Sequence, residues 1–309
     1  MNVFSIYFSK PKCGILLATL LWMLVLCGCG RDPNGSGSSK YRPLVISAIP
    51  DERVSDQEVK FEALKSYLAN QLDIPVEFSI SSDYGATVQR FRNSEIHLAW
   101  FGGYTGVQAR EAVTGARAIA QGMVDTDFKS YLIAHQSTGL IRSEAFPGDV
   151  LREMTFTFGS PSSTSGRLMP TYFFLKETGQ KPEDFFVNPV QFQQTGGHDA
   201  TVRAVASGAV QLGVVSFKKY DSMVREGEID PADAPVIWVT PGYPDYNLTV
   251  HTDLEEQFGA GFIDRLQQVL VDCEDPDVLR AFSRKKLIPA SNEDFEKIAS
   301  VARDLGMLR

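Results

Sequence analysis

The stretch Thr155-Phe-Thr-Phe158-Gly-Ser-Pro-Ser-Ser163-Thr164-Ser165-Gly166 contains the unit from which the fold is built. Its first four residues favour a short buried strand, and a loop of Gly, Ser and Pro follows. Apolar residues at helical spacing then run from 168 to 175. A strand that passes through a polar loop directly into a helix is the repeating unit of an α/β protein. The stretch therefore predicts an α/β fold with a hydroxyl-rich helix start.

The same unit recurs along the body of the chain. Strands are predicted at 44–49, 76–80, 96–101, 131–135, 155–158, 190–193, 210–215 and 236–239. Ser55 and Glu58 have the spacing of a capping box, which predicts that the first helix begins after Ser55 as its cap. Strands that alternate with helices indicate right-handed βαβ units on a mainly parallel sheet.

Two α/β blocks can be separated along the chain. Their junctions lie near 130–136 and 236–243, so we expect two lobes joined by two crossings. The first lobe is expected to comprise 44–130 and 244–309, and the second 131–243. A single large sheet domain remains the alternative, because such sheets can exceed the usual domain length.

The first 28 residues have the pattern of a signal peptide. Lys10 and Lys12 precede an uncharged run at 15–26 that is too short for an ordinary membrane-spanning helix. The run ends in Leu26-Cys27-Gly28-Cys29, which resembles the lipobox of bacterial lipoproteins. That resemblance implies cleavage before Cys29 and a lipid on its thiol; an uncleaved anchor is the alternative. Residues 29–43, rich in Gly and Ser, are then expected to form a flexible tether.

Charge and cysteine content exclude several classes of protein. The 309 residues carry 30 Lys and Arg against 38 Asp and Glu, a net charge of -8, so a long nucleic-acid footprint is not expected. Of the four cysteines, Cys13 and Cys27 would leave with the signal peptide and Cys29 would be lipidated. Cys273 would remain alone, so no intrachain disulfide is expected, and it is predicted to be a small buried apolar residue.

Several predicted helix starts carry residues that suit an anion. Helix N-termini bind anions through unpaired backbone N–H groups, at the edge of the sheet where ligands bind. Residues 160–166 offer five hydroxyls where one suffices as a cap, and this excess favours a ligand. Gly196-Gly197-His198-Asp199 repeats the arrangement with a histidine able to carry charge, although capping by Asp199 is the alternative. Tyr84 and Tyr104 lie at comparable positions, where packing is the alternative.

Four motifs give the chain a family resemblance. They are Ser82-Asp-Tyr84-Gly, Ile96-His-Leu-Ala-Trp100-Phe-Gly-Gly, the stretch 158–166, and Gly197-His198-Asp199 with the six residues that follow. With them the chain resembles the phosphonate/phosphite-type substrate-binding proteins of bacterial ABC importers, which have the type II periplasmic-binding fold. The resemblance implies two lobes that close on an oxyanion held by Ser163, Thr164, Ser165, His198 and Tyr84.

The chain departs from the family's aminophosphonate binders at three positions. Phe101 stands where those proteins have a tyrosine, with Tyr104 three residues later as a further candidate ligand contact. Lys218 and Tyr246 stand where they have acidic residues, although the neighbouring Asp245 leaves the second match open. The departures favour a small oxyanion without a cationic tail, such as phosphite, a simple phosphonate, phosphate, sulfate or selenate, and they make Tyr246 a candidate contact.

The resemblance further implies a monomeric extracytoplasmic lipoprotein that delivers its ligand to an ABC permease, without cofactor, metal or enzymatic activity. A ligand sensor for a signalling partner and a secreted hydrolase are the alternatives. In a hydrolase Ser163, His198 and Asp199 would act as nucleophile, base and orienting group. Adjacent residues on a helix do not face each other, and no Gly-x-Ser-x-Gly motif occurs, so the hydrolase is disfavoured. The four histidines show no metal-binding spacing.

Overall fold

The computed structural model describes residues 42–193 and 197–308, all within one compact unit, Ser39–Arg309. The predicted signal peptide (1–28), Cys29 and the tether as far as residue 41 lie outside the described residues, as does Gly196. Among the helices that are described, none combines the length and the apolar character needed to cross a membrane.

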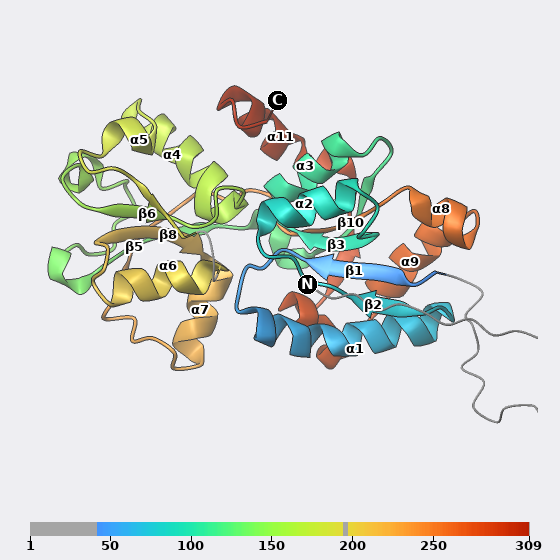
Figure 1. Cartoon of the computed structure of the whole chain (residues 1–309). Helices are drawn as coiled ribbons and strands as arrows, with labels where there is room; N and C mark the ends of the chain where they lie inside the picture. The colour runs from blue at the N-terminus through green and yellow to red at the C-terminus, as the bar shows by residue number, and fades with distance from the viewer. Residues whose placement is uncertain (1–41, 194–196, 309) are drawn as a thin grey trace, which may run out of the picture. The chain divides into compact units, whose positions relative to one another are not determined.

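Two mixed sheets organise the described chain (Figure 1). The first has the strand order β11 (Leu287–Pro289), β4 (Arg117–Gly122), β10 (Asn247–Val250), β3 (Leu98–Phe101), β1 (Leu44–Ala48), β2 (Val76–Phe78). The second has the order β7 (Gln191–Phe192), β6 (Phe156–Phe158), β8 (Leu212–Ser216), β5 (Ser130–Ala134), β9 (Val236–Val239). The first sheet thus takes strands from both ends of the described chain, and the second takes the strands between them.

The expectation of a mainly parallel sheet is wrong. β1 pairs in parallel with β2 and β3, and β6 with β7 and β8. β10 runs antiparallel to β3 and β4, β11 to β4, and β5 to β8 and β9. The reason is the two crossings: β4 leads out of the first sheet and β10 returns beside it, while β5 enters the second sheet and β9 leaves beside it. Neighbouring strands that leave and enter at the same edge must run in opposite directions.

Helices cover both faces of each sheet (Figure 1). Figure 1 shows α4 and α5 on one face of the second sheet and α6 and α7 on the other, and all five residues of β8 between them are buried. The helices are α1 (Val54–Leu72), α2 (Tyr84–Arg92), α3 (Gly103–Ala112), α4 (Met169–Thr178), α5 (Pro182–Phe185), α6 (Gly197–Ala206), α7 (Phe217–Arg225), α8 (Asp253–Phe258), α9 (Phe262–Val271), α10 (Pro276–Leu279) and α11 (Glu296–Asp304).

Short helical turns complete the element list: η1 (Met123–Asp127), η2 (Gln136–Thr138), η3 (Gly148–Leu151), η4 (Thr164–Leu168), η5 (Arg280–Phe282) and η6 (Asn292–Phe295). α1 begins at Val54 with Arg53 at its N-cap and no side-chain cap, so the predicted capping box at Ser55 is wrong. The free cysteine Cys273 is buried, which confirms the prediction for it.

The two crossings, 123–129 and 240–246, are fastened to each other. Phe128 and Tyr243 form an isolated antiparallel bridge, and the Asp245 N–H donates to the Asp125 carbonyl at 2.9 Å. The Asp125 carboxylate in turn accepts two hydrogen bonds from the Arg284 guanidinium, at 2.6 and 2.7 Å, and both side chains are buried. A residue from the C-terminal segment therefore holds the first crossing in place.

Candidate functional site

Loops and helix starts that follow strands of the two sheets lie next to each other and form one candidate site. The first sheet contributes the loop after β1 and the starts of α2 and α3, and the second contributes the starts of η4 and α6. The His198 N–H donates to the Asp51 carbonyl at 3.0 Å, and the Tyr104 N–H donates to the Thr164 hydroxyl at 3.0 Å. All seven predicted contact residues are at most 4% exposed: Tyr84, Tyr104, Ser163, Thr164, Ser165, His198 and Tyr246.

Ser163 serves as the helix cap. Its hydroxyl accepts the Gly166 N–H at 2.9 Å and also bonds with Tyr84, so it joins elements of the two sheets. The helix that follows opens with the wide turn η4 and continues as α4. A Cβ at Gly166 would lie 3.2 Å from the His198 ring, which explains the glycine there. Because one hydroxyl is enough for the cap, Thr164 and Ser165 have other roles.

Thr164 and Asp245 together cap α3 from other parts of the chain. The Thr164 hydroxyl accepts the Tyr104 N–H, and Asp245 Oδ1 accepts the Gly103 N–H at 2.8 Å. The Tyr104 hydroxyl, however, donates to the Met307 carbonyl at 2.5 Å. Tyr104 thus brings its backbone N–H to the site, while its hydroxyl is turned to the C-terminal segment.

His198 is held as a neutral hydrogen-bond donor. Its Nδ1 accepts the Ser216 N–H at 3.4 Å, so the ring proton resides on Nε2, which lies 3.3 Å from the Ser165 hydroxyl. Burial, aided by the nearby Lys219 cation, lowers the pKa of His198 to about 3. The sequence-based expectation of a histidine that carries charge is therefore wrong for this site, because desolvation disfavours the imidazolium.

Two carboxyl groups outside the seven predicted contact residues lie in the same site. Asp51 accepts the Tyr246 hydroxyl and the Gln57 amide, each at 2.8 Å, and burial, with Glu52 nearby, raises its pKa to about 6. Burial raises the pKa of Asp245 to about 7, although hydrogen bonds from Gly103 and Thr164 oppose the shift. Asp245 Oδ2 is buried without a hydrogen-bond partner. Of the two matches left open for this loop, Asp245 therefore provides an acidic residue at the site.

A sequence signal for both carboxyl groups existed. Asp51 closely follows β1, at the strand end where ligands bind in α/β sheets. Asp245 lies two residues before β10, and because β10 is antiparallel to β3, its amino end lies at that same edge.

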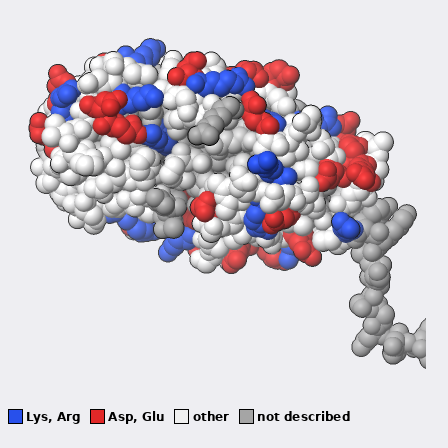
Figure 2. Space-filling view, turned by 45° about the horizontal axis from the view of Figure 1, so that its top comes forward, with Lys and Arg blue, Asp and Glu red and all other residues white. Residues whose placement is uncertain are grey.

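The cations beside the site are already paired. Lys219 donates to Glu52 at 2.6 Å, and Arg284, whose guanidinium lies 5.1 Å from the centre of the Tyr246 ring, is paired with Asp125. Over the face in Figure 2, acidic and basic side chains are interspersed, and no continuous basic field is seen among the described residues it shows. The site therefore offers neutral donors around a buried carboxyl group.

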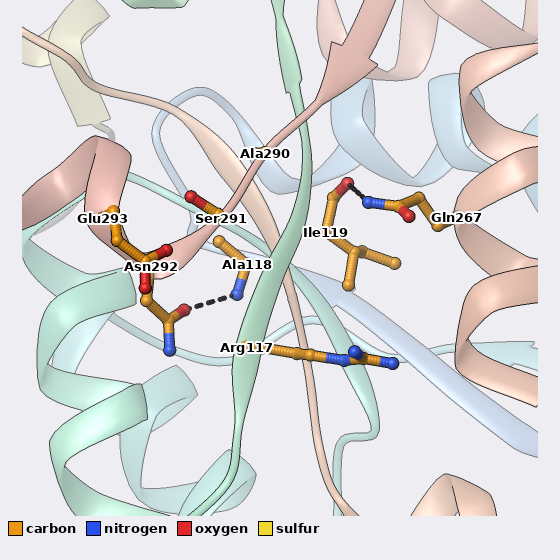
Figure 3. A pocket seen from close by; sticks show the side chains of 8 residues that line it. All are labelled: Arg117, Ala118, Ile119, Gln267, Ala290, Ser291, Asn292 and Glu293. Carbon is orange, nitrogen blue, oxygen red and sulfur yellow. Dashed lines mark hydrogen bonds between the residues drawn. The ribbon is translucent and has the colours of Figure 1, made fainter. Parts of the chain in front are cut away.

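A separate hollow of about 270 Å³ lies along β4 (Figure 3), but its polar backbone groups are occupied. The Ala118 N–H is taken by Asn292 at 2.9 Å, and the Ile119 carbonyl by Gln267 at 2.6 Å. Its lining consists of Arg117, Ala118, Ile119, Gln267, Ala290, Ser291, Asn292 and Glu293. Within the described ranges, no three His, Cys, Asp or Glu side chains are gathered as metal ligands.

Comparison with known proteins agrees with this architecture. The family described as the periplasmic substrate-binding protein of phosphonate ABC transporters matches residues 46–295. A probable phosphite-binding protein, PhnD1 of Prochlorococcus marinus, is 32% identical over 277 residues, which is 88% of this chain and 92% of the relative. The phosphate-import protein PhnD of Mycolicibacterium smegmatis is 29% identical over 232 residues, 72% of this chain and 70% of the relative.

The solved structures identify the fold. PhnD1 of P. marinus in complex with methylphosphonate has a TM-score of 0.80 at 32% identity, covering 86% of this chain and 98% of its own. A binding-protein component of a phosphonate transporter from Pseudomonas aeruginosa has a TM-score of 0.72 at 18% identity, with 84% and 85% covered. The type II periplasmic-binding fold expected from the sequence is confirmed. The chain belongs to the family of periplasmic substrate-binding proteins of phosphonate ABC transporters.

Proposed function

We propose that this protein binds a small phosphorus oxyanion, such as phosphite, methylphosphonate or phosphate, and delivers it as a monomer to an ABC permease. The ligand lies between two lobes, of which one comprises 44–130 and 244–309 and the other comprises 131–243. The site's donors support an anion: the hydroxyl of Ser165 and the Nε2–H of His198, which lie 3.3 Å apart. The two walls of the site touch directly through the Tyr104–Thr164 and His198–Asp51 hydrogen bonds, each 3.0 Å long.

The observation that carries the proposal is the unpartnered Oδ2 of Asp245. A buried carboxyl oxygen without a partner costs free energy, and a proton shared with a ligand oxygen would remove that cost. Phosphorus oxyanions can bring this proton at neutral pH, whereas with sulfate it must come from Asp245 itself. The names of the relatives, which refer to phosphite, phosphate and methylphosphonate, agree with this chemistry.

The geometry disfavours a hydrolase. The expected nucleophile, Ser163, caps η4 and is not the hydrogen-bond partner of His198. His198 Nδ1 accepts a backbone N–H instead of donating to a carboxylate, so Nε2 carries the proton and cannot act as a base. Asp199 Oδ1 is unpartnered and does not orient the ring. A role as a sensor for a signalling partner needs the same ligand site, and loss of ligand uptake on deletion of the gene separates transport from sensing.

A thermal-unfolding screen of residues 30–309 tests the ligand class. Phosphite, methylphosphonate, phosphate, sulfate, selenate and 2-aminoethylphosphonate are compared at equal concentration. A ligand present at 100 times its dissociation constant should add about 2.7 kcal/mol to the free energy of unfolding. We expect the largest stabilisation from a phosphorus oxyanion without an amine. Stabilisation by 2-aminoethylphosphonate alone would instead assign Asp245 to an ammonium group.

We further propose that the mature protein is anchored by a lipid on Cys29, as the sequence Leu26-Cys27-Gly28-Cys29 suggests. Cys29→Ala should release the protein from membranes into the soluble fraction, because a thioether-linked lipid can no longer form. Metabolic labelling with a fatty acid checks this, with Cys273→Ala as the control that keeps its label. Incorporation of label into Cys29→Ala would contradict the anchor.

A further inference from the structure

Three consecutive residues of the loop after β1 reach elements of the second sheet. The Asp51 carbonyl accepts the His198 N–H at 3.0 Å. Glu52 Oε2 lies 2.6 Å from the ammonium of Lys219 on α7. Arg53 Nη2 lies 4.0 Å from Glu228 Oε1. This short segment therefore holds the two sides of the site together along one rim.

Glu52 is the centre of this rim. Its carboxylate accepts two hydrogen bonds from the ammonium of Lys60 on α1, at 2.6 and 2.7 Å. Across the site it accepts one hydrogen bond from the ammonium of Lys219. The side chains of Glu52 and Lys219 are only 10% and 19% exposed. A pair so shielded from water is screened less by salt than a surface ion pair, and its charge-assisted hydrogen bond fixes its geometry.

The ligand cannot enter or leave while these contacts stand. The side chains that line the site are at most 4% exposed, so its two walls must part for exchange. Parting them separates Glu52 from Lys219, since one lies after β1 and the other on α7, whereas Glu52 and Lys60 lie on the same side and remain paired.

We propose that the Glu52–Lys219 pair is a latch that sets the residence time of the bound oxyanion by holding the Asp51 carbonyl against the His198 N–H. Both are positioning residues: they act on the ligand through the closed loop. The proposal rests on the proposed function, because a residence time requires a bound oxyanion.

Simple electrostatics makes a different prediction for Glu52. If the two residues acted only through the field at the anion, loss of the Lys219 cation would speed dissociation, but loss of the Glu52 anion would slow it. A latch requires both partners, so loss of either should speed dissociation. The direction of the effect at Glu52 therefore distinguishes the two explanations.

The experiment compares Glu52→Gln, Lys219→Met and Lys60→Met with the unchanged protein. Dissociation of bound methylphosphonate is followed by stopped-flow tryptophan fluorescence, since Trp100 stacks on Tyr246 at 5.4 Å between ring centres. We expect dissociation to be about tenfold faster in Glu52→Gln and in Lys219→Met, with association within about threefold. Lys60→Met also removes one positive charge and one ion-pair partner of Glu52, but its dissociation rate should stay within about twofold of that of the unchanged protein.

Slower dissociation in Glu52→Gln, or equal acceleration in Lys60→Met and Lys219→Met, would overturn the latch. A far-ultraviolet circular dichroism spectrum of each variant verifies that the fold is kept, and the charge-conserving Lys219→Arg should restore slow dissociation. If the unchanged protein binds none of phosphite, methylphosphonate and phosphate, the proposed function fails. If it binds and all variants dissociate alike, only the latch fails.

Discussion

Replacing Gly197 with alanine should weaken phosphite and methylphosphonate binding by about a hundredfold or more. Gly197 has φ +59°, and a Cβ there would lie 2.1 Å from the Asp51 carbonyl oxygen. The methyl group would push the loop after β1 away from the start of α6 and break the hydrogen bond between His198 and Asp51. A hundredfold loss corresponds to about 2.7 kcal/mol, and the overlap with the Asp51 carbonyl is the cause. The left-handed strain of an alanine at this φ adds a loss of stability but no loss of affinity.

Gly227 supplies the matched control for this prediction. It has φ +72°, and a Cβ at that position would meet nothing within 4 Å. Gly227→Ala should therefore lower the free energy of unfolding by about 1 to 2 kcal/mol through strain alone and leave affinity unchanged. Calorimetry with methylphosphonate and urea unfolding of both variants measure the two effects. Equal affinities for the two variants would show that the contact at Gly197 is not needed for binding.

Asp245→Asn should reverse the pH dependence of phosphite affinity. With a pKa of about 7, the buried carboxyl group can donate a proton to a fully ionised oxyanion at lower pH but repels it when ionised. Affinity of the unchanged protein should thus fall about tenfold for each pH unit above roughly 7.5. The asparagine amide donates at every pH, so near pH 9 the variant should bind phosphite more tightly than the unchanged protein.

Titration calorimetry at pH 6, 7.5 and 9 makes the measurement. The difference between the two proteins matters, because other groups titrate equally in both. Stability gives an independent check: a group whose folded pKa is raised stabilises the fold at low pH, and this contribution is lost as pH rises through about 7. The free energy of unfolding of the ligand-free protein should therefore fall relative to Asp245→Asn between pH 5 and 8. Parallel curves in both experiments would mean that Asp245 does not titrate there.

The strand, loop and helix pattern was sufficient to predict most of the fold. Local apolar runs such as 236–239 have the length and flanking residues of buried strands, and the structure places β9 at the same residues. A helix start within 160–166 was predictable from the strand, polar loop and apolar helical run around it, and the structure places the cap at Ser163. Strand direction was not, since it depends on where the chain crosses between sheets, which no short pattern records.

The charge states of the residues in the site could not be predicted from the sequence alone. A neutral His198 follows from burial and from the Ser216 N–H, which is 18 residues away in the chain. Asp245 Oδ1 accepts the N–H of Gly103 at the start of α3, 142 residues earlier in the chain, and this leaves Oδ2 without a partner. Both depend on contacts distant in sequence, whereas motif spacing reports only residues that are near neighbours along the chain.

The position of β10 between β3 and β4 has a consequence for the order of folding. β3 and β4 are complete by residue 122, yet the strand that joins them is made only at 247–250. Arg284, which holds the first crossing in place through its ion pair with Asp125, is synthesised later still. Closing such long loops is slow, because their entropy is lost before the distant contacts form. During synthesis the first sheet must therefore stay incomplete until most of the chain exists, which leaves a long interval for an unfolded chain to be moved across a membrane.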